Sequence, residues 1–332
     1  MRIFLPFVNK CYHFFVRTER KHYFCNIIWY NMALDNDSNN SHPSDLQPQP
    51  SNPKPNSVEI DVEKVLRDKM GSKARWVPCF VVRWLKKIIH QDDMNSFFRA
   101  HADEEGVQWL RSVVEYADMR ITVKGLDNLP VDPEARLTFA SNHPLGGIDG
   151  VALGAILGEH YGGNIRYLLN DILMNLPGLR PLGVAVNVTG AQGRGAMLKV
   201  EEVFASGHQL IMFPAQLCSR KIKGRVQDLP WKKAVVQKSV QHHRDIVPVH
   251  FSGQNSNRFY RIANISKALG LKVNVAMLFL VDELYRNMHK PFTVTIGKPI
   301  PWQTFTAERS HTEWAQWLRS QVYQLAEQDI KK

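Results

Sequence analysis

The sequence predicts an α/β fold, in which a mixed, largely parallel sheet is flanked by helices and preceded by a small N-terminal helical subdomain. Two patterns support this prediction. After residue 119, short runs of β-branched residues alternate with helix-length segments, as expected for strands joined by helices that cover one sheet. Before residue 119, apolar residues recur at the spacing of amphipathic helices. With 332 residues, 44% of them hydrophobic, the chain can bury a sizeable core in one large domain or two smaller ones.

The first 57 residues are predicted to lie outside the folded part. Residues 1–31 contain an apolar run of only Ile3–Val8, which is too short for the core of a signal peptide, and Met32 offers an alternative start. Residues 35–57 are almost entirely Asn, Ser, Pro, Gln and Asp, which cannot bury enough apolar surface to offset the entropy of ordering. We therefore predict a disordered or over-extended tail at residues 1–57.

Residues 58–118 are predicted to form a membrane-facing subdomain of about four helices. On a helical wheel, the segment Val77–His90 has an apolar arc wider than one neighbouring helix would cover, beside a cationic edge. Trp76, Phe80 and Trp84 adjoin that edge, and we expect them to enter the interface of an anionic membrane. The alternative is a helix that simply packs on the α/β domain.

The α/β domain is predicted to span residues 119–332. Its strands are expected at residues 120–123, 137–140, 165–169, 184–188, 210–213, 246–251 and 292–296. In sheets of this kind the chemistry usually takes place just beyond the carboxyl ends of the strands.

Charge narrows the class of partner. The 42 basic and 31 acidic side chains give a net charge of +11, which favours nucleic acid, a membrane surface or a phosphorylated molecule. Aromatic residues fall at helical spacing and are not interleaved with basic ones, so no nucleic-acid partner is expected. No apolar stretch reaches the length of a spanning helix, so any membrane association should be peripheral.

Cysteine usage bears on the cellular compartment. The four cysteines contain no CxxC pair and look like reduced thiols: Cys11, Cys25, Cys79 and Cys218. We therefore expect a cytoplasmic protein, peripheral on the inner face of the cell membrane. Neither Gly-x-Ser-x-Gly nor HExxH occurs, which argues against a serine hydrolase and a zinc site.

The stretch Thr138–Gly150 carries the strongest chemical signal. Its predicted strand ends near His143, a loop rich in proline and glycine follows, and Asp149 begins a helix. A histidine in this place can act as a general base towards a hydroxyl if a carboxylate orients it and stabilises its positive charge. Proline and glycine favour an irregular loop that lets the two side chains meet. The alternative is a loop histidine beside an N-capping aspartate.

This block resembles the His-x4-Asp motif of the glycerolipid acyltransferases, a family that includes lysophosphatidate acyltransferase. It is still closer to a bacterial branch that reads Asn-His-Pro-x-Gly-Gly-x-Asp. Here five residues separate His143 from Asp149, and we expect the loop to absorb the extra one. Three further stretches resemble the family's later blocks in the same order, Asn170–Leu179, Phe213-Pro214 and Ile246–Val249. Four blocks in order, within about residues 120–302, are more specific than any one of them.

The resemblance implies a peripheral membrane O-acyltransferase. His143 would take the proton of an acceptor hydroxyl as that oxygen attacks an acyl thioester, and Asp149 would orient His143. No acyl-enzyme, metal or tightly bound cofactor is implied. The donor would be an acyl carrier protein (acyl-ACP) or coenzyme A (acyl-CoA) thioester, and the acceptor a lipid or lysolipid. A non-catalytic lipid-binding protein that retains the fold is the alternative.

The resemblance also implies residues that bind the acceptor or the donor. They lie within or next to the family's blocks: Asn142, Arg194, Phe213, Pro214, Arg220 and Lys221. Ala215 and Gln216 replace the family's usual Glu-Gly, so a plain glycerol-phosphate acceptor is not expected. The basic run that begins at Arg220 suits a phosphate, a lipid head group or the acidic surface of an acyl carrier.

Overall fold

The computed structural model describes residues 59–130, 132, 134–186, 194–269 and 275–330. The predicted tail at residues 1–57 lies outside the described residues.

A seven-stranded sheet forms the centre of the molecule, in the order β1-β9-β8-β2-β5-β3-β4. Its strands are β1 Arg120–Lys124, β2 Leu137–Ser141, β3 Ile165–Asn170, β4 Gly183–Val186, β5 Gln209–Met212, β8 Asp245–Phe251 and β9 Pro291–Ile296. All neighbouring strands are parallel except β8 and β9. The predicted fold class, a mixed and largely parallel sheet with flanking helices, is therefore confirmed.

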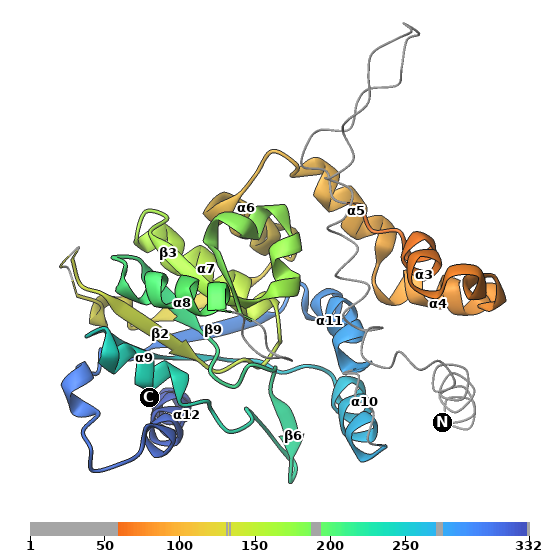
Figure 1. Cartoon of the computed structure of the whole chain (residues 1–332). Helices are drawn as coiled ribbons and strands as arrows, with labels where there is room; N and C mark the ends of the chain where they lie inside the picture. The colour runs from red at the N-terminus through yellow and green to blue at the C-terminus, as the bar shows by residue number, and fades with distance from the viewer. Residues whose placement is uncertain (1–58, 131, 133, 187–193, 270–274, 331–332) are drawn as a thin grey trace, which may run out of the picture.

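Helices cover both faces of the sheet, and Figure 1 shows α7 on one side with α9 and α12 on the other. The helices that follow β2 along the chain are α7 Ile148–His160, α8 Arg194–Ala205, α9 Ala234–Gln241, α10 Asn257–Ala268, α11 Leu280–Asn287 and α12 His311–Ile330. Because side chains alternate along a strand, Phe139 of β2 joins the apolar cluster around α7 while Ala140 joins the cluster around α9 and α12. The carboxyl end of β2 is thus held in the middle of the sheet.

The N-terminal helices are α3 Val62–Met70, α4 Cys79–Ile88, α5 Gln91–Ala100 and α6 Gly106–Tyr116. A 3-10 helix, η2 Gly71–Trp76, links α3 to α4, and the other short 3-10 helices are η3 Leu126–Asn128, η4 Asp171–Asn175, η5 Pro177–Leu182, η6 Val275–Phe279 and η7 Trp302–Thr304. Leu85, Phe98 and Leu110 are buried in the same cluster as α7 and the sheet. The N-terminal helices therefore share a core with the α/β part, and the predicted division into domains stays a prediction.

Helix α4 is shorter than the predicted Val77–His90 because Pro78 precedes its first turn and His90 adopts a left-handed conformation. Trp76 is the last residue of the 3-10 helix η2 and does not belong to α4, and its side chain is 68% exposed. Phe80 is 59% exposed, whereas the Trp84 ring packs edge-on against Phe279, with 6.0 Å between ring centroids. Trp84 is half-buried and packs partly against the protein, so its expected entry into a membrane interface stays a prediction. No helix in the described part of the chain is long and apolar enough to cross a bilayer.

A basic hairpin projects from the sheet and was not predicted. It consists of β6 Arg220–Ile222 and β7 Arg225–Gln227, which pair only with each other. Lys223 and Gly224 at its tip both have positive φ angles, 48° and 82°, as a tight two-residue turn of this handedness requires. Figure 1 shows the hairpin beside α10.

Candidate active site

His143 and Asp149 meet, as the sequence predicted. The imidazole Nδ1 of His143 lies 3.1 Å from Oδ2 of Asp149. His143 follows the carboxyl end of β2 and Asp149 lies in the first turn of α7, so an irregular loop connects them. Gly146 in this loop has a φ of 80°, and a Cβ there would lie 2.8 Å from Cβ of Cys218. Glycine is required at this position both by the backbone and by the space.

The Asp149 carboxylate is completely buried and is held by backbone amides at the start of α7. Oδ2 accepts hydrogen bonds from the amides of Leu145 and Gly146 (2.9 and 3.3 Å), and Oδ1 from those of Gly147 and Gly150 (3.0 and 2.9 Å). Burial alone would raise the pKa of this carboxyl, but the charge and hydrogen bond of His143, with the backbone amides, hold the pKa below its ordinary value. The positive end of the α7 dipole favours the same ionised form.

The environment of His143 would suit a general base. An ionised carboxylate can only accept, so Nδ1 carries the hydrogen in this contact and Nε2 is left to take a proton. Burial would lower the pKa of His143, but Asp149 and the charge of Asp228 outweigh it and raise the pKa, while Arg220 opposes them. The ring lies against Phe213, with 4.3 Å between centroids.

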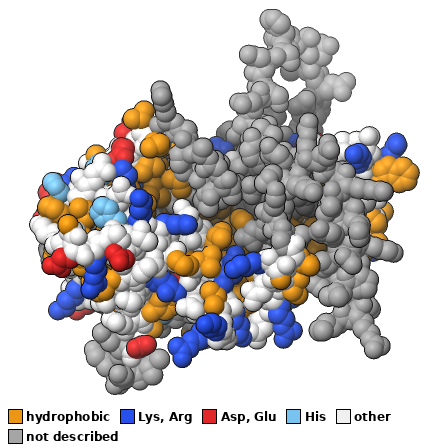
Figure 2. Space-filling model, turned by 60° about the horizontal axis from the view of Figure 1, so that its bottom comes forward, with side chains coloured by type: hydrophobic (Ala, Val, Ile, Leu, Met, Phe, Trp, Pro, Cys, Tyr) orange, Lys and Arg blue, Asp and Glu red, His pale blue; other side chains and the backbone are white. Residues whose placement is uncertain are grey.

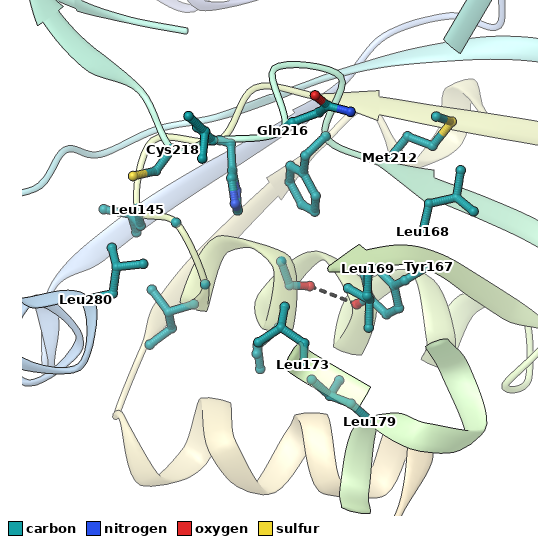
Figure 3. A pocket seen from close by; sticks show the side chains of 18 of the residues that line it. Leu145, Tyr167, Leu168, Leu169, Leu173, Leu179, Met212, Gln216, Cys218 and Leu280 are labelled. Atoms are coloured by element: carbon teal, nitrogen blue, oxygen red, sulfur yellow. Dashed lines mark hydrogen bonds between the residues drawn. The ribbon is translucent and has the colours of Figure 1, made fainter. Parts of the chain in front are cut away.

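A largely apolar cavity of about 490 Å³ opens beside His143. Its walls combine side chains of the N-terminal helices, the sheet, α8 and α11, including Phe97, Phe98, Leu168, Leu169, Val200, Met212, Leu280 and Leu284. Figure 3 shows Leu145, Cys218 and Leu280 on one side of the cavity and Tyr167, Leu168 and Met212 on the other. The size and lining suit hydrocarbon chains.

The predicted binding residues are not all at the cavity. Phe213 and Pro214 line it. The Asn142 side chain is buried, and both its polar groups pair with the backbone of Phe251 at the end of β8 (2.9 and 2.7 Å). Asn142 therefore anchors the loop that carries His143, and a direct role in binding a substrate stays a prediction. Arg194 is the first residue of α8, and its side chain lies outside the described part of the structure, so its role stays a prediction.

Arg220 and Lys221 occupy the base of the hairpin and point to different partners. Nη1 of Arg220 donates to the carbonyl oxygen and the Sγ of Cys218, at 2.6 and 2.9 Å. Because Cys218 lines the cavity, Arg220 lies directly behind its wall. Lys221 Nζ instead donates to Oδ1 of Asn257 on α10, at 2.8 Å. Burial raises the pKa of the Cys218 thiol, which disfavours the thiolate that an acyl-enzyme would need.

Asp228 is a buried residue of the site that sequence reasoning missed. It is 1% exposed, and its Oδ1 accepts a hydrogen bond from the backbone amide of His143 (3.2 Å). The signal in the sequence was a single acid within a run of basic residues. Within the part of the chain that the structure describes, no group of three or more His, Cys, Asp or Glu residues could hold a metal ion.

Known acyltransferases resemble this chain in sequence. A family model described as an acyltransferase matches residues 64–329. A protein of Phocaeicola vulgatus named lyso-glycine lipid O-acyltransferase is 54% identical over 266 residues, which cover 80% of this chain and 95% of that protein. A protein of the same name from Bacteroides thetaiotaomicron is 53% identical over 266 residues, with 80% and 97% coverage.

Among solved structures, the 1-acyl-sn-glycerophosphate acyltransferase of Thermotoga maritima is similar at a TM-score of 0.43 and 17% identity, over 67% of this chain and 80% of that one.

Proposed function

The chain belongs to the acyltransferase family whose model it matches, and from this premise we propose that it transfers a fatty acyl chain from a thioester to a hydroxyl of a lysolipid. The observation that carries the proposal is the 3.1 Å contact between His143 and a buried, ionised Asp149, beside an apolar cavity. That the chain is a lipid acyltransferase follows from its family and relatives. A non-catalytic lipid-binding protein, the alternative from sequence, is not favoured by any of these observations.

In the proposed mechanism, Nε2 of His143 takes the proton of the acceptor hydroxyl as its oxygen attacks the thioester carbonyl carbon. The tetrahedral intermediate then collapses, the carbon–sulfur bond breaks, and the thiolate leaves with the proton from the imidazolium. Asp149 stabilises the imidazolium that exists between these two steps. The protein thus forms no covalent intermediate, which agrees with the protonated state favoured for the Cys218 thiol.

For the acceptor, we propose a lysolipid with a glycine group, since two relatives more than half identical are named for that substrate. Glycine has no alcohol hydroxyl, so the oxygen that is acylated belongs to the lipid part of the molecule. The replacement of the family's usual Glu-Gly by Ala215 and Gln216 supports an acceptor other than glycerol phosphate. Arg220, behind the Cys218 wall, is suited to an anionic group of either substrate.

For the donor, an acyl-ACP or acyl-CoA thioester is proposed. Both carry a phosphorylated pantetheine arm, and the hairpin next to the site supplies cations for an anion of this kind. The hairpin contains Arg220, Lys221, Lys223 and Arg225 but no acidic residue. Figure 2 shows Lys and Arg side chains gathered on the face of the molecule that lies at the bottom of Figure 1.

We further propose that the enzyme works as a peripheral protein on the inner face of the cell membrane. Trp76 and Phe80 expose their rings at the start of α4, where the Arg75 guanidinium lies 5.6 Å from the Trp76 ring. Aromatic rings beside cations suit the interface of an anionic bilayer. The lysolipid acceptor and at least one product would then stay in the membrane.

The test is an assay of the purified full chain with acyl-ACP or acyl-CoA and either a lyso-glycine lipid or lysophosphatidate. We expect the acylated glycine lipid by mass spectrometry and a His143→Ala variant that makes none. Faster acylation of lysophosphatidate would contradict the proposed acceptor. Wild-type turnover by His143→Ala would contradict the general-base role.

A further inference from the structure

The backbone of His143 is held on both sides by the segment that encloses the basic hairpin. Its carbonyl oxygen accepts a hydrogen bond from the amide of Ser219, at 2.7 Å, and its amide donates to Oδ1 of Asp228, at 3.2 Å. Ser219 directly precedes β6 and Asp228 directly follows β7. Ser219 also donates its hydroxyl to Oδ1 of Asp228, at 2.6 Å, which closes the base of the hairpin around the catalytic residue.

Asp228 is itself fixed to a rigid part of the fold. Its amide donates to the hydroxyl of Tyr323 (2.8 Å), and its carbonyl accepts from Arg319 Nη2 (2.7 Å); both partners belong to α12. Its second carboxylate oxygen accepts from Nε1 of the buried Trp231, at 2.9 Å. A continuous chain of hydrogen bonds thus runs from α12 through Asp228 to the peptide of His143.

The charge of Asp228 needs an explanation, because a buried carboxylate held by neutral donors is costly. Its described donors are a backbone amide, a hydroxyl and an indole. In contrast, the protonated His143 that forms during transfer is a cation, and a fixed negative charge behind it favours that state.

We propose that Asp228 is a positioning residue for the transfer reaction: its carboxylate anchors His143 to α12, and its charge stabilises the imidazolium during turnover. This inference rests on the proposed general-base role of His143. Asp228 is then a second carboxylate of the site, in addition to Asp149. At 1% exposure it is not accessible to a substrate.

The prediction is a change in the pH dependence of the reaction, so every charged group near His143 matters. They are Asp149 on α7, Asp228 after β7, Arg220 on β6, the Cys218 thiol and, in the walls of the same cavity, Glu201, Lys232, Lys238 and Glu283. The Asp228→Asn substitution removes the negative charge of Asp228 and leaves all the other charged groups in place. His143 must be unprotonated to start the reaction, so activity rises with pH through its pKa.

In the Asp228→Asn variant, we expect the plateau of kcat/KM to fall about tenfold, as weakened hydrogen bonds to the base would cause. We also expect the acid limb of the profile to move to lower pH by about half a unit to one unit, because one negative charge near the imidazolium is gone. An unchanged plateau of kcat/KM would overturn the proposal. A lower plateau with an acid limb at the wild-type pH would also overturn it, because a purely structural role of Asp228 predicts that result.

Two control variants keep the charge. Trp231→Phe removes the indole bond to Asp228, and Ser219→Ala removes the hydroxyl bond; each should lower the plateau severalfold and leave the limb in place. If Asp228→Asn does not fold, Ser219→Ala still tests the anchoring, because full wild-type activity in that variant contradicts it. An NMR titration of the His143 ring measures the pKa without turnover. It therefore separates a failure of this inference from a failure of the general-base role.

Discussion

The hydroxyl of Tyr167 donates a 2.8 Å hydrogen bond to the carbonyl oxygen of Gly150, the residue that follows the carboxylate of the dyad (Figure 3). Tyr167 belongs to β3, so this bond ties the first turn of α7 to a neighbouring strand. Gly154 leaves the space for the hydroxyl, because a Cβ at that position would overlap it. The place of Asp149 thus depends on a glycine one turn further along the helix.

The Gly154→Ala variant should therefore be destabilised by about 1 to 3 kcal/mol, the usual cost of overpacking a buried contact. The free energy of unfolding in urea measures it. Gly195→Ala is the control, because Gly195 lies in α8 and a Cβ there meets nothing within 4 Å. The control should be neutral or more stable by up to about 1 kcal/mol. Equal effects of the two substitutions would contradict the packing argument.

The dyad predicts the pH profile of an Asp149→Asn variant. Asp149 is the main group that raises the pKa of His143 against the effect of burial, so its removal should lower that pKa. Activity, which needs the neutral imidazole, would then begin at lower pH than in the wild type. Its maximum should be about 10²- to 10⁴-fold lower, since the imidazolium loses its partner. An acid limb that moves to higher pH would contradict this assignment.

We predict that the two sides of the cavity hold different hydrocarbon chains, one from the donor and one from the acceptor. Leu280 and Leu168 lie on opposite sides of it in Figure 3. Leu280→Trp and Leu168→Trp should each reduce kcat/KM for long chains by about tenfold or more, one for the donor chain and the other for the acceptor chain. A series of chain lengths in each substrate measures this. Leu269→Trp is the control, since Leu269 is exposed and does not line the cavity. Loss for the same substrate in both variants would contradict two separate places.

Local sequence patterns predicted the sheet well. Each of the seven predicted runs coincides with or overlaps a strand of the main sheet, although residues 187–188 of one run lie outside the described residues. Central strands such as β2 are buried on both faces and therefore read as short apolar segments between turns. Such local patterns could not predict the order of the strands in the sheet. β1 pairs with β9, for example through Val123 and Val294, and nothing local to either strand marks a partner so distant in the chain.

The site was predictable only where the residues share one stretch of sequence. His143 and Asp149 lie within one motif, and their contact was predicted. The hairpin was missed because its three-residue strands hold only Ile222 and Val226 as apolar residues. Asp228 was missed because the backbone amide that it contacts belongs to His143, which is far away in the sequence. The helical wheel placed Trp84 beside the cationic edge but could not reveal its contact with Phe279.

Removing residues 1–57 should leave folding and activity largely unchanged. Their composition predicts a segment without a core of its own. The melting temperature and kcat/KM of the truncated and full chains provide the measurement. Loss of soluble protein, or of most activity, would show that the tail contributes to the fold or to the site.

The exposed rings at the start of α4 predict how the protein meets a membrane. Replacing Trp76 and Phe80 together by Ala should weaken binding to anionic vesicles by about tenfold or more, because their apolar surface would no longer be buried in the interface. The melting temperature should not fall, since both side chains are more than half exposed at 68% and 59%. Trp84→Ala is the matched control in the same helix. Its half-buried ring packs on Phe279, so it should lose stability, and while folded it should lose less vesicle binding than the double variant.

Charge provides the second half of this test. Lys86 is paired with Glu63 at 2.7 Å, whereas Arg83 and Lys87 are exposed on the same helix. Arg83→Gln with Lys87→Gln should weaken binding to anionic vesicles by about 1 kcal/mol per charge, and this loss should disappear in vesicles of zwitterionic lipid or at high salt. The aromatic variant should lose binding to both kinds of vesicle, because burial of a ring does not depend on lipid charge. If neither variant changes vesicle binding, α4 is a packing helix and the membrane is met elsewhere.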